Sequence, residues 1–432
     1  MTQALSVAAL LEQASCQSNV PIQLGLERVS RLLAKMDNPQ QELDCVHVAG
    51  TNGKGPVLAF LESILRHAGY RVGLYTSPHL HCVNERIQVA GQWITDAALA
   101  RLLAAVLAAN AGRPATFFEL LTVVALCHFR DQGLGRAEAG RGIVLLETGL
   151  GGRLDATNVV QPLLSIVTCI ALDHTDYLGA DLAAIAAEKA GIFKPSVPAV
   201  AASGQPEVEE ILRRQAQERG TPLAILGRDF FLCPPLHFLP PLASPDVSTS
   251  ADDTWWFQDA GSCYALPRPA LSGRHQLENA ALAIAGMRRL REVGWPVDEP
   301  SMLAGVRNAR WPGRLERFSL PGQDGQMRTF LLDGAHNPSG CLSLANFLRE
   351  SKAQSLHSTL LLFSVVQDKP VEEMVRTLLP HVEQVWTTRV GGERGHSAEF
   401  LASLWQSLDR PAHACATPAE GFAAALAACP PG

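Results

Sequence analysis

Short apolar runs alternate with longer segments of helical periodicity along almost the whole chain, and few folds accommodate that pattern. Each run has the length of a single strand buried on both faces, and the segments between the runs are long enough for helices. Neighbouring parallel strands need a long crossover, which is usually a helix. The alternation therefore predicts an α/β protein with a parallel central sheet.

The predicted strands are rich in Val, Ile, Leu and Ala, and the predicted helices carry apolar residues at helical spacing. The strands are expected at Cys45–Ala49, Arg71–Tyr75, Gly142–Glu147, Leu163–Thr168, Val197–Ala201, Thr329–Asp333, Thr359–Ser364 and Gln384–Thr388. The helices are expected at Val57–Ala68, Leu99–Asn110, Thr116–Arg130, Asp181–Ala190, Pro206–Arg219, Leu277–Val293, Ser339–Ser351 and Ala398–Leu408.

Two breaks interrupt this pattern. Between Asp229 and Pro269, prolines cluster around a short strand-like stretch, Thr254–Phe257, which predicts a surface excursion with one hairpin. After Gly294, further prolines and tryptophans precede a new βαβ series. We therefore expect two domains, residues 1–309 and residues 310–432.

Composition excludes several classes of protein. With 432 residues, of which 47% are hydrophobic, the chain can bury a large core, and its net charge of −6 provides no basic field for nucleic acid. No apolar run is long enough to span a bilayer, and the N-terminal residues lack the basic start of a signal peptide. The ten cysteines form no C-x-x-C pair and are expected to be reduced and mostly buried. We therefore expect a cytoplasmic protein without nucleic-acid or membrane partners.

A glycine-rich turn follows the first predicted strand and leads directly into a helix. The segment reads Val46-His47-Val48-Ala49-Gly50-Thr51-Asn52-Gly53-Lys54-Gly55-Pro56. Glycines let backbone N–H groups close around a phosphate, the helix N-terminus adds positive potential, and Lys54 would neutralise the β- and γ-phosphates. The strict pattern G-x-x-x-x-G-K-[ST] is not met, because Val48 occupies the position of its first glycine and Gly55 occupies the position of its Ser or Thr. An ordinary glycine turn therefore remains an alternative at this point.

Polar segments stand at the carboxyl ends of three further predicted strands, where ligands bind in open α/β sheets. They are Tyr75–Leu80, Leu145–Asn158 and Ala171–Gly179. A hydroxyl, a carboxylate and an imidazole converging beside a phosphate loop favour a magnesium ion that bridges nucleotide and protein. Simpler interpretations stay open, with Glu147 as a helix cap or salt-bridge partner and His174 as a hydrogen-bonded core residue.

Three segments further along carry polar groups whose role the residues alone leave open. Lys189 ends an alanine-rich helix and is expected, on this basis, to be a solvated cation favoured by the helix dipole. Ser272–Asn279 opens a helix with amide side chains that suit either a nucleotide or simple capping. Leu332–Pro338 places polar groups after a strand, and Trp311–Arg314 precedes it.

Taken together, these segments resemble those of a known family. In order along the chain they read GTNGKG, TSPHL, NERI, ETGLGGRLDATN, ALDHTDYLG, EKAGI, GRHQLENA, WPGRLE and DGAHNP, and the matching region runs from Leu24 to Lys369. The chain resembles the folylpolyglutamate synthases and bifunctional dihydrofolate synthase/folylpolyglutamate synthases, a branch of the Mur ligase superfamily.

The resemblance implies an ATP-dependent amide ligase that acts as a monomer. It implies an N-terminal P-loop mononucleotide-binding domain with a parallel central sheet, a smaller C-terminal Rossmann-like α/β domain, and an active site in the cleft between them. In such enzymes MgATP phosphorylates a carboxylate of dihydropteroate or a folate, and the amino group of L-glutamate then displaces the phosphate. The residues do not decide between dihydropteroate, folates or both as substrates.

Site residues carry over from the resemblance position by position. It implies nucleotide contacts at Gly50, Thr51, Asn52, Gly53, Lys54, Gly55, Asn279, Arg314, Asp333 and His336. It implies magnesium ligands at Ser77, Glu147 and His174, and catalytic roles for Lys54, His174 and Lys189. Lys189 matches a lysine that is carbamylated in the family, which would make it an anion able to hold a second Mg²⁺. Pterin binding is expected at Phe117, Phe118, Gly152, Arg153, Asp155 and Ala156.

Two departures from the family motivate a rival hypothesis. Pro56 stands where the family has Ser or Thr, so a hydroxyl that would bond the phosphates is missing, although proline is tolerated in a first helical turn. After Ala428 the chain stops at Cys429–Gly432, where the family continues into a final apolar strand and a closing helix, so that strand is expected to be absent. The rival is a non-catalytic or impaired nucleotide-binding homologue.

Within the superfamily, chain length favours the folate ligases over the cell-wall ligases. Only 46 residues precede His47, which are too few for the separate N-terminal substrate domain that the cell-wall enzymes carry.

Overall fold

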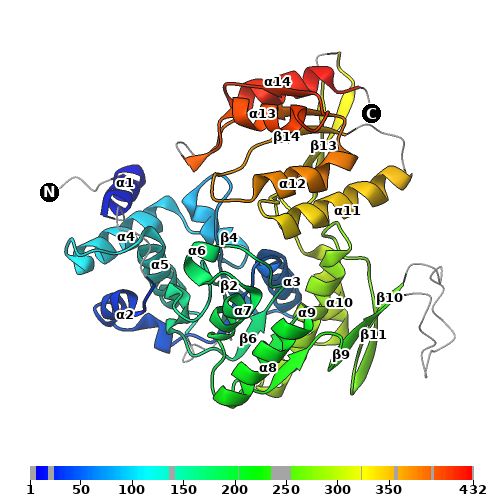
Figure 1. Ribbon diagram of the computed structural model, residues 1–432. Coiled ribbons are helices and arrows are strands. Elements are labelled where there is room, and N and C mark those ends of the chain that lie inside the picture. Colours follow the sequence, from blue (N-terminus) through cyan, green and yellow to red (C-terminus); the bar gives the residue numbers. More distant parts are fainter. Residues whose placement is uncertain are drawn as a thin grey trace. The chain divides into compact units, whose positions relative to one another are not determined.

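The computed structural model describes residues 6–17, 24–135, 142–202, 204–234, 254–322, 324–354, 359–390 and 394–430. The chain forms two compact units (Figure 1). Unit 1 comprises Met1–Ala270 and Gln276–Arg310, and unit 2 comprises Leu271–His275 and Trp311–Gly432.

Unit 1 is built on an eight-stranded sheet with the strand order β4-β3-β2-β5-β1-β6-β7-β8. All neighbours pair in parallel except β3 and β4, which extend one edge in antiparallel fashion. The strands are β1 (Cys45–Ala49), β2 (Arg71–Tyr75), β3 (Ile87–Val89), β4 (Gln92–Trp93), β5 (Gly142–Glu147), β6 (Leu164–Val167), β7 (Ala199–Ala201) and β8 (Leu223–Ile225). The predicted parallel central sheet is confirmed.

Helices cover both faces of this sheet (Figure 1). They are α1 (Val7–Gln17), α2 (Glu27–Ala34), α3 (Lys54–His67), α4 (Asp96–Asn110), α5 (Phe117–Asp131), α6 (Thr175–Leu178), α7 (Leu182–Ala190), α8 (Pro206–Arg219), α9 (His275–Glu292) and α10 (Glu299–Asn308). Short 3₁₀ turns stand at η1 (Pro39–Gln41), η2 (Val83–Arg86) and η3 (Ala156–Val159).

Strand alternation decides which side chains meet which helices, because successive residues of a strand point to opposite faces. On β6, Leu164 and Ile166 lie against Gly286 of α9. Val167, of opposite parity, belongs to the core formed with α7 and α8. Gly305 of α10 lies directly on Ile64 of α3, where an added Cβ would come within 2.4 Å of the Ile64 Cα. Helices α3, α9 and α10 therefore form one layer, and α7 and α8 lie on the other face.

The prolines between Asp229 and Pro269 accompany a small separate sheet rather than a single hairpin. Its strands are β9 (Phe230–Cys233), β10 (Trp255–Asp259) and β11 (Ser262–Leu266), and both pairings are antiparallel. The expected strand at Thr254–Phe257 is confirmed as β10, whereas residues 235–253 of the expected excursion lie outside the described residues. Arg288 of α9 donates to Asp259 and to Tyr264, which ties this sheet to the helix.

Unit 2 holds a three-stranded parallel sheet and a two-stranded antiparallel one. Its strands are β12 (Glu316–Pro321), β13 (Met327–Leu332), β14 (Leu360–Phe363), β15 (Gln384–Thr387) and β16 (Ala412–Ala414). Its helices are α11 (Pro338–Gln354), α12 (Val371–Leu378), α13 (Ala398–Gln406) and α14 (Pro418–Ala428), with a 3₁₀ turn at η5 (Leu379–His381). Side chains of α11, α12 and α13 share one core with Phe363 of β14. Leu362, the preceding residue of β14, points to the opposite face of the sheet and contacts Gly421 of α14.

One expectation for unit 2 is wrong. The strand expected at Thr329–Asp333 does not begin a βαβ series, because β13 pairs in antiparallel register with β12. All six residues of β12 are exposed, so the apolar pattern that marks a buried strand is missing there. Strand β16 was not predicted, and only Ala412 of its three residues is buried.

Two further expectations concern the whole chain. All ten cysteines are free, as expected, but only Cys45, Cys127 and Cys341 are buried, so the expectation of mostly buried thiols is wrong. Within the described residues, no helix combines the length and the apolar character that crossing a membrane requires.

Candidate active site

The glycine-rich loop between β1 and α3 adopts a conformation that only glycine fits. Gly53 has a φ of +90°, and a Cβ placed there would lie 2.6 Å from the Asn279 side-chain oxygen. A Cβ on Gly50 would lie 1.8 Å from the Thr168 hydroxyl oxygen. Both positions therefore need glycine, because the Thr168 and Asn279 side chains lie close against the loop backbone. Asn279, a predicted nucleotide contact, adjoins the loop.

A neighbouring segment after β6 holds the loop in place. The Thr51 amide donates to the Cys169 carbonyl at 2.8 Å, and the Thr51 hydroxyl donates to the Ala171 carbonyl at 3.0 Å. The Thr168 hydroxyl donates to the Asn52 carbonyl at 2.7 Å. These contacts place the loop at the carboxyl edge of the parallel sheet, where α/β proteins bind ligands.

Lys54 is the first residue of α3, and its side chain folds back over the loop. Its Nζ donates to the carbonyl oxygens of Gly50 and Thr51 at 3.0 and 3.3 Å. The same ammonium lies 4.0 Å from Glu147 Oε1. Lys54 thus presents its positive charge at the helix N-terminus, between the loop and a buried carboxylate.

The three expected magnesium ligands are brought together in part. Glu147 ends β5, is 4% exposed, and accepts a hydrogen bond from the Ser77 amide at 2.8 Å. His174 is the residue before α6 and has a φ of 50°, and its Nε2 lies 4.0 Å from Asp173 Oδ1. No cluster of three or more His, Cys, Asp or Glu side chains that could hold a metal exists among the described residues. One buried carboxylate beside a phosphate cradle fits Mg²⁺, which draws most of its ligands from phosphate and water.

Lys189 is buried rather than solvated, so the expectation from its helix-end position is wrong. It is 4% exposed, and its Nζ donates to the Gly50 carbonyl at 2.9 Å. Burial, and secondly the charge of Lys54, lowers the pKa of Lys189 to about 7. The last turn of α7 points this side chain at the loop, and helix position alone could not reveal that.

A second loop, residues 149–158, follows β5 and is closed by a buried carboxylate. Asp155 is 4% exposed, and its Oδ2 accepts from the amides of Gly149 and Leu150 at 2.9 and 2.8 Å. Its Oδ1 accepts from both the amide and the hydroxyl of Thr157. Burial raises the pKa of Asp155, and these four hydrogen bonds oppose that rise. The carboxylate therefore holds the loop closed at both ends.

The same loop rests on the end of α7. Arg153 donates its amide to the Glu188 carbonyl at 2.8 Å and pairs its guanidinium with the Glu188 carboxylate at 2.7 Å. A Cβ on Gly152 would lie 2.8 and 2.9 Å from the carbonyls of Glu188 and Lys189. Gly152, Arg153, Asp155 and the buried Ala156, all expected on the pterin side, therefore lie on one loop packed against the helix that carries Lys189.

The two expected aromatic contacts come from the first turn of α5. Phe118 stacks on Tyr75 with ring centroids 5.8 Å apart, and its ring lies 2.6 Å from the position a Cβ on Gly149 would take. Phe117 lies under the Arg86 guanidinium, 5.8 Å from the ring centroid. Both rings are only partly buried, so they provide apolar surface beside the loop of residues 149–158.

In unit 2, Arg314, Asp333 and His336 meet around the turn that follows β13. Asp333 accepts from the amides of Leu315 and Ala335, both at 2.9 Å. His336 Nδ1 is hydrogen-bonded to the Gly334 carbonyl oxygen at 2.7 Å. A Cβ on Gly334 would lie 2.7 Å from Arg314 Nη1, so the Arg314 guanidinium lies against the same turn. The three expected nucleotide contacts of this unit therefore lie close together.

Two buried residues near the loops were not singled out from the sequence. His47 and Thr157 are both 0% exposed, and His47 Nε2 lies 2.8 Å from the Thr157 hydroxyl. A histidine inside a strand that leads into a glycine-rich loop was a usable signal, because polar residues are rare in strands buried on both faces.

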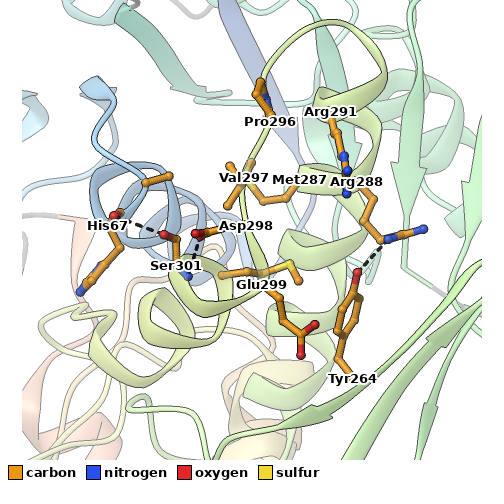
Figure 2. Close-up of a pocket in the computed structure, with 12 residues that line it drawn as sticks. His67, Tyr264, Met287, Arg288, Arg291, Pro296, Val297, Asp298, Glu299 and Ser301 are labelled. Atoms are coloured by element: carbon orange, nitrogen blue, oxygen red, sulfur yellow. Dashed lines mark hydrogen bonds between the residues drawn. The ribbon is translucent and has the colours of Figure 1, made fainter. Parts of the chain in front are cut away.

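The cavity of about 610 Å³ in Figure 2 lies elsewhere in unit 1. It opens between the C-terminal end of α3 and the helices α9 and α10, and its lining includes His67, Arg288, Arg291 and Glu299. Since α3 has 14 residues, this end is about 20 Å from the glycine-rich loop. The charges around the cavity are mixed in sign, and none of the expected site residues lines it.

Comparison with known proteins gives concordant matches. Residues 313–432 match the model of the "Mur ligase, glutamate ligase domain". The chain is 36% identical to the dihydrofolate synthase/folylpolyglutamate synthase of Bacillus subtilis, covering 82% of this chain and 78% of that protein. It resembles the E. coli FolC structure with DHPP and ADP, with a TM-score of 0.83, 32% identity and coverage of 99% and 93%. A bifunctional folylpolyglutamate synthase/dihydrofolate synthase with Mn, AMPPNP and L-glutamate bound matches with a TM-score of 0.80, 30% identity and coverage of 99% and 95%.

Proposed function

The chain belongs to the dihydrofolate synthase/folylpolyglutamate synthase family, and we propose that it joins L-glutamate to dihydropteroate, to the γ-carboxylate of folates, or to both. The reaction consumes ATP and releases ADP and phosphate. The observation that carries this proposal is the glycine-rich loop at the N-terminus of α3, with Lys54, Glu147 and Lys189 converging on it. The relatives support a catalytic protein and not the non-catalytic alternative.

The chemistry explains why a phosphate site is needed for making an amide. A carboxylate is a poor electrophile because its leaving group would be an oxide ion. Transfer of the γ-phosphoryl group gives an acyl phosphate, whose carbon–oxygen bond breaks to release phosphate when the glutamate amine attacks. The amine loses a proton in this step, and the product is an amide.

We assign the nucleotide phosphates to the loop of Gly50, Thr51, Asn52, Gly53, Lys54 and Gly55. The amides at the start of α3 and the Lys54 ammonium favour negative charge there. Glu147, with Ser77 and His174, would hold Mg²⁺, which neutralises charge on the phosphates. The buried Glu147 carboxylate lies 4.0 Å from Lys54, so metal and lysine would act on the same phosphates.

We assign Lys189 a role as a carbamate. A pKa of about 7 leaves a large fraction of the amine neutral at physiological pH, and only the neutral amine can attack carbon dioxide. The resulting anion beside the loop would hold a second Mg²⁺. Mass spectrometry of the native protein in bicarbonate should detect the added carbon dioxide, and a plain amine under those conditions would exclude this role.

The remaining assignments follow the two units. We place the folate substrate against Phe117, Phe118 and the loop that carries Gly152, Arg153, Asp155 and Ala156, because aromatic surface and that loop adjoin. Asn279 of unit 1, and Arg314, Asp333 and His336 of unit 2, are assigned to the nucleotide. On this division residues 1–309 bind ATP and folate, and residues 310–432 form the smaller domain.

Two broader assignments belong to the same proposal. Ten free cysteines agree with a reducing, cytoplasmic location. A monomer is proposed, and light scattering after gel filtration would detect a dimer if that is wrong.

The function is tested by incubating the protein with ATP, magnesium, L-glutamate and either dihydropteroate or tetrahydrofolate. Mass spectrometry should show a product that has gained one glutamate, together with stoichiometric ADP. ATP binding without a glutamate-dependent product from either substrate would instead support the non-catalytic alternative.

A further inference from the structure

His47 is a buried polar residue on the strand that leads into the phosphate loop, and nothing in the proposed reaction uses it. It is 0% exposed and stands three positions before Gly50 on β1. Like Cys45 and Ala49, it points away from α3, toward the 3₁₀ turn η3. There its Nε2 lies 2.8 Å from the Thr157 hydroxyl.

The direction of the hydrogen bonds follows from counting donors and acceptors. Asp155 accepts from three backbone amides, which favour its ionised form, and an ionised carboxylate accepts hydrogen bonds but donates none. The single hydroxyl proton of Thr157 is therefore donated to Asp155. Thr157 can then only accept from His47, which must carry its proton on Nε2.

The other ring nitrogen of His47 shows that this arrangement has a cost. With the proton on Nε2, Nδ1 is a bare acceptor, and it is buried without a hydrogen-bond partner in the described structure. An unsatisfied buried acceptor destabilises the fold, so an apolar side chain would suit this place in the core at least as well. The imidazole is therefore explained by what its Nε2 does rather than by packing.

The hydrogen bonds from His47 through Thr157 to Asp155 join the two loops of the site. His47 belongs to the strand that ends in the phosphate loop, and Asp155 closes the loop proposed to receive the pterin. Phosphoryl transfer needs the substrate carboxylate aligned with the γ-phosphate, and small displacements of reacting atoms are costly. A rigid link between the two loops supplies that alignment.

Resting on the proposed function, we propose that His47 is a positioning residue, which donates through Nε2 to Thr157, keeps the Thr157 proton on Asp155, and so holds residues 149–157 in the conformation that receives the pterin substrate. His47 itself touches neither substrate nor nucleotide in this role. Its effect is expected on the binding of the pterin substrate and not on the binding of ATP.

Two matched pairs of variants test the link. His47→Leu removes the donor at similar volume, whereas His47→Gln keeps an N–H near the Nε2 position. Thr157→Val removes the hydroxyl without changing shape, whereas Thr157→Ser keeps it. The KM for dihydropteroate and for ATP, kcat and the melting temperature would be measured for each, together with direct titrations of dihydropteroate by its fluorescence and of ATP by calorimetry.

We expect His47→Leu and Thr157→Val each to raise the KM and the Kd for dihydropteroate about tenfold, the usual effect of removing an outer partner of a binding group. The KM and the Kd for ATP should change less than about twofold, since neither substitution alters a residue of the phosphate loop. His47→Gln and Thr157→Ser should retain wild-type affinity. The double variant His47→Leu/Thr157→Val should be no worse than either single variant, because both remove the same link.

Equal losses for ATP and dihydropteroate, additive losses in the double variant, or a Thr157→Ser protein as impaired as Thr157→Val would each overturn the proposal. The tautomer provides an independent readout, because ¹⁵N chemical shifts should place the His47 proton on Nε2, and a proton on Nδ1 would contradict it. If the wild-type protein ligates no glutamate, the proposed function fails. The two binding titrations then still decide whether His47 acts on the pterin side.

Discussion

Lys189 Nζ donates to the carbonyl oxygen of Gly50 at 2.9 Å, joining two residues that are 139 positions apart in the chain. The same carbonyl accepts from Lys54 at 3.0 Å, so two ammonium groups share one oxygen at the first glycine of the phosphate loop. Because like charges at this spacing repel, the Lys54 ammonium favours the neutral form of Lys189. Conversion of Lys189 to an anionic carbamate would turn this repulsion into attraction beside the proposed metal site.

Lys189→Ala should lower the rate of ligation on the order of 10²-fold, because the proposed carbamate ligand is lost. A small carboxylate such as formate should restore part of the rate by occupying the vacated space, while leaving the wild-type rate unchanged. Steady-state rates with and without formate provide the measurement. A variant with wild-type activity would exclude the role.

Glu147→Gln should strongly reduce magnesium-dependent turnover while the fold stays intact. The amide oxygen can still accept from the Ser77 amide, but the charge that attracts the cation is gone. A fall in kcat on the order of 10²-fold is expected, with a rightward shift of the magnesium titration. Glu62→Gln is the control, since Glu62 pairs with Arg66 on the surface of α3. Unchanged turnover in Glu147→Gln would contradict the metal assignment.

Gly53→Ala should impair ATP binding, and Gly69→Ala separates this effect from backbone strain. Both glycines have positive φ, +90° and +84°, so alanine costs about 1–2 kcal/mol of folding free energy at either place. At Gly53 the new methyl group would also meet the Asn279 side chain, whereas nothing lies within 4 Å at Gly69. Calorimetry should therefore show weakened ATP binding only for Gly53→Ala. Equal weakening in both variants would mean that the loop is not the nucleotide site.

Pro56→Ser should lower the KM for ATP. Pro56 is the third residue of α3 and is buried, and a hydroxyl there could bond a phosphate oxygen. A hydrogen bond to a charged group is worth about 1.5–3 kcal/mol, which corresponds to a gain of about tenfold or more in affinity. The melting temperature should fall slightly, because proline restricts the unfolded chain. An unchanged or higher KM would show that the chain does not need this hydroxyl.

His47→Gln should reduce the sensitivity of the fold to acid. Burial, and secondly Lys194, lowers the pKa of His47 from 6.5 to about 3. Between these values the unfolded chain binds a proton that the native protein does not, so wild-type stability falls as the pH drops from 6.5 toward 3. The slope from this one group is about 1.4 kcal/mol per pH unit. Urea unfolding at several pH values should show a shallower slope for His47→Gln and not for His413→Gln, an exposed control.

Local patterns predicted much of the fold. All eight predicted strands and all eight predicted helices are present, with ends that differ by a few residues. Helix α3 begins three residues before its predicted start at Val57, because Gly53 supplies the left-handed conformation that ends the loop. Strand β12 was missed because its six exposed residues lack an apolar pattern, so β13 was assigned to the βαβ series although it pairs with β12.

The residues of the candidate site were predicted only where local pattern places them. Glu147 and the glycine-rich loop follow buried strands, so their place at the carboxyl edge of the sheet could be inferred. Lys189 was misjudged, because a position in the last turn of a helix does not say which face of that helix is covered. His47 was overlooked, because its partner Thr157 lies 110 residues away.

The amino-acid sequence by itself determined the alternation of strands and helices and the reaction class that the ordered motifs imply. It also determined that the glycine-rich loop and the loop of residues 149–158 follow buried strands. These properties depend on neighbours within a few positions, where periodicity and backbone conformation are set. The tertiary structure alone decided which distant groups share one environment, including Lys189 with Gly50 and His47 with Asp155 through Thr157. Burial and hydrogen bonding, which depend on such long-range packing, set the protonation of those groups and hence their chemistry.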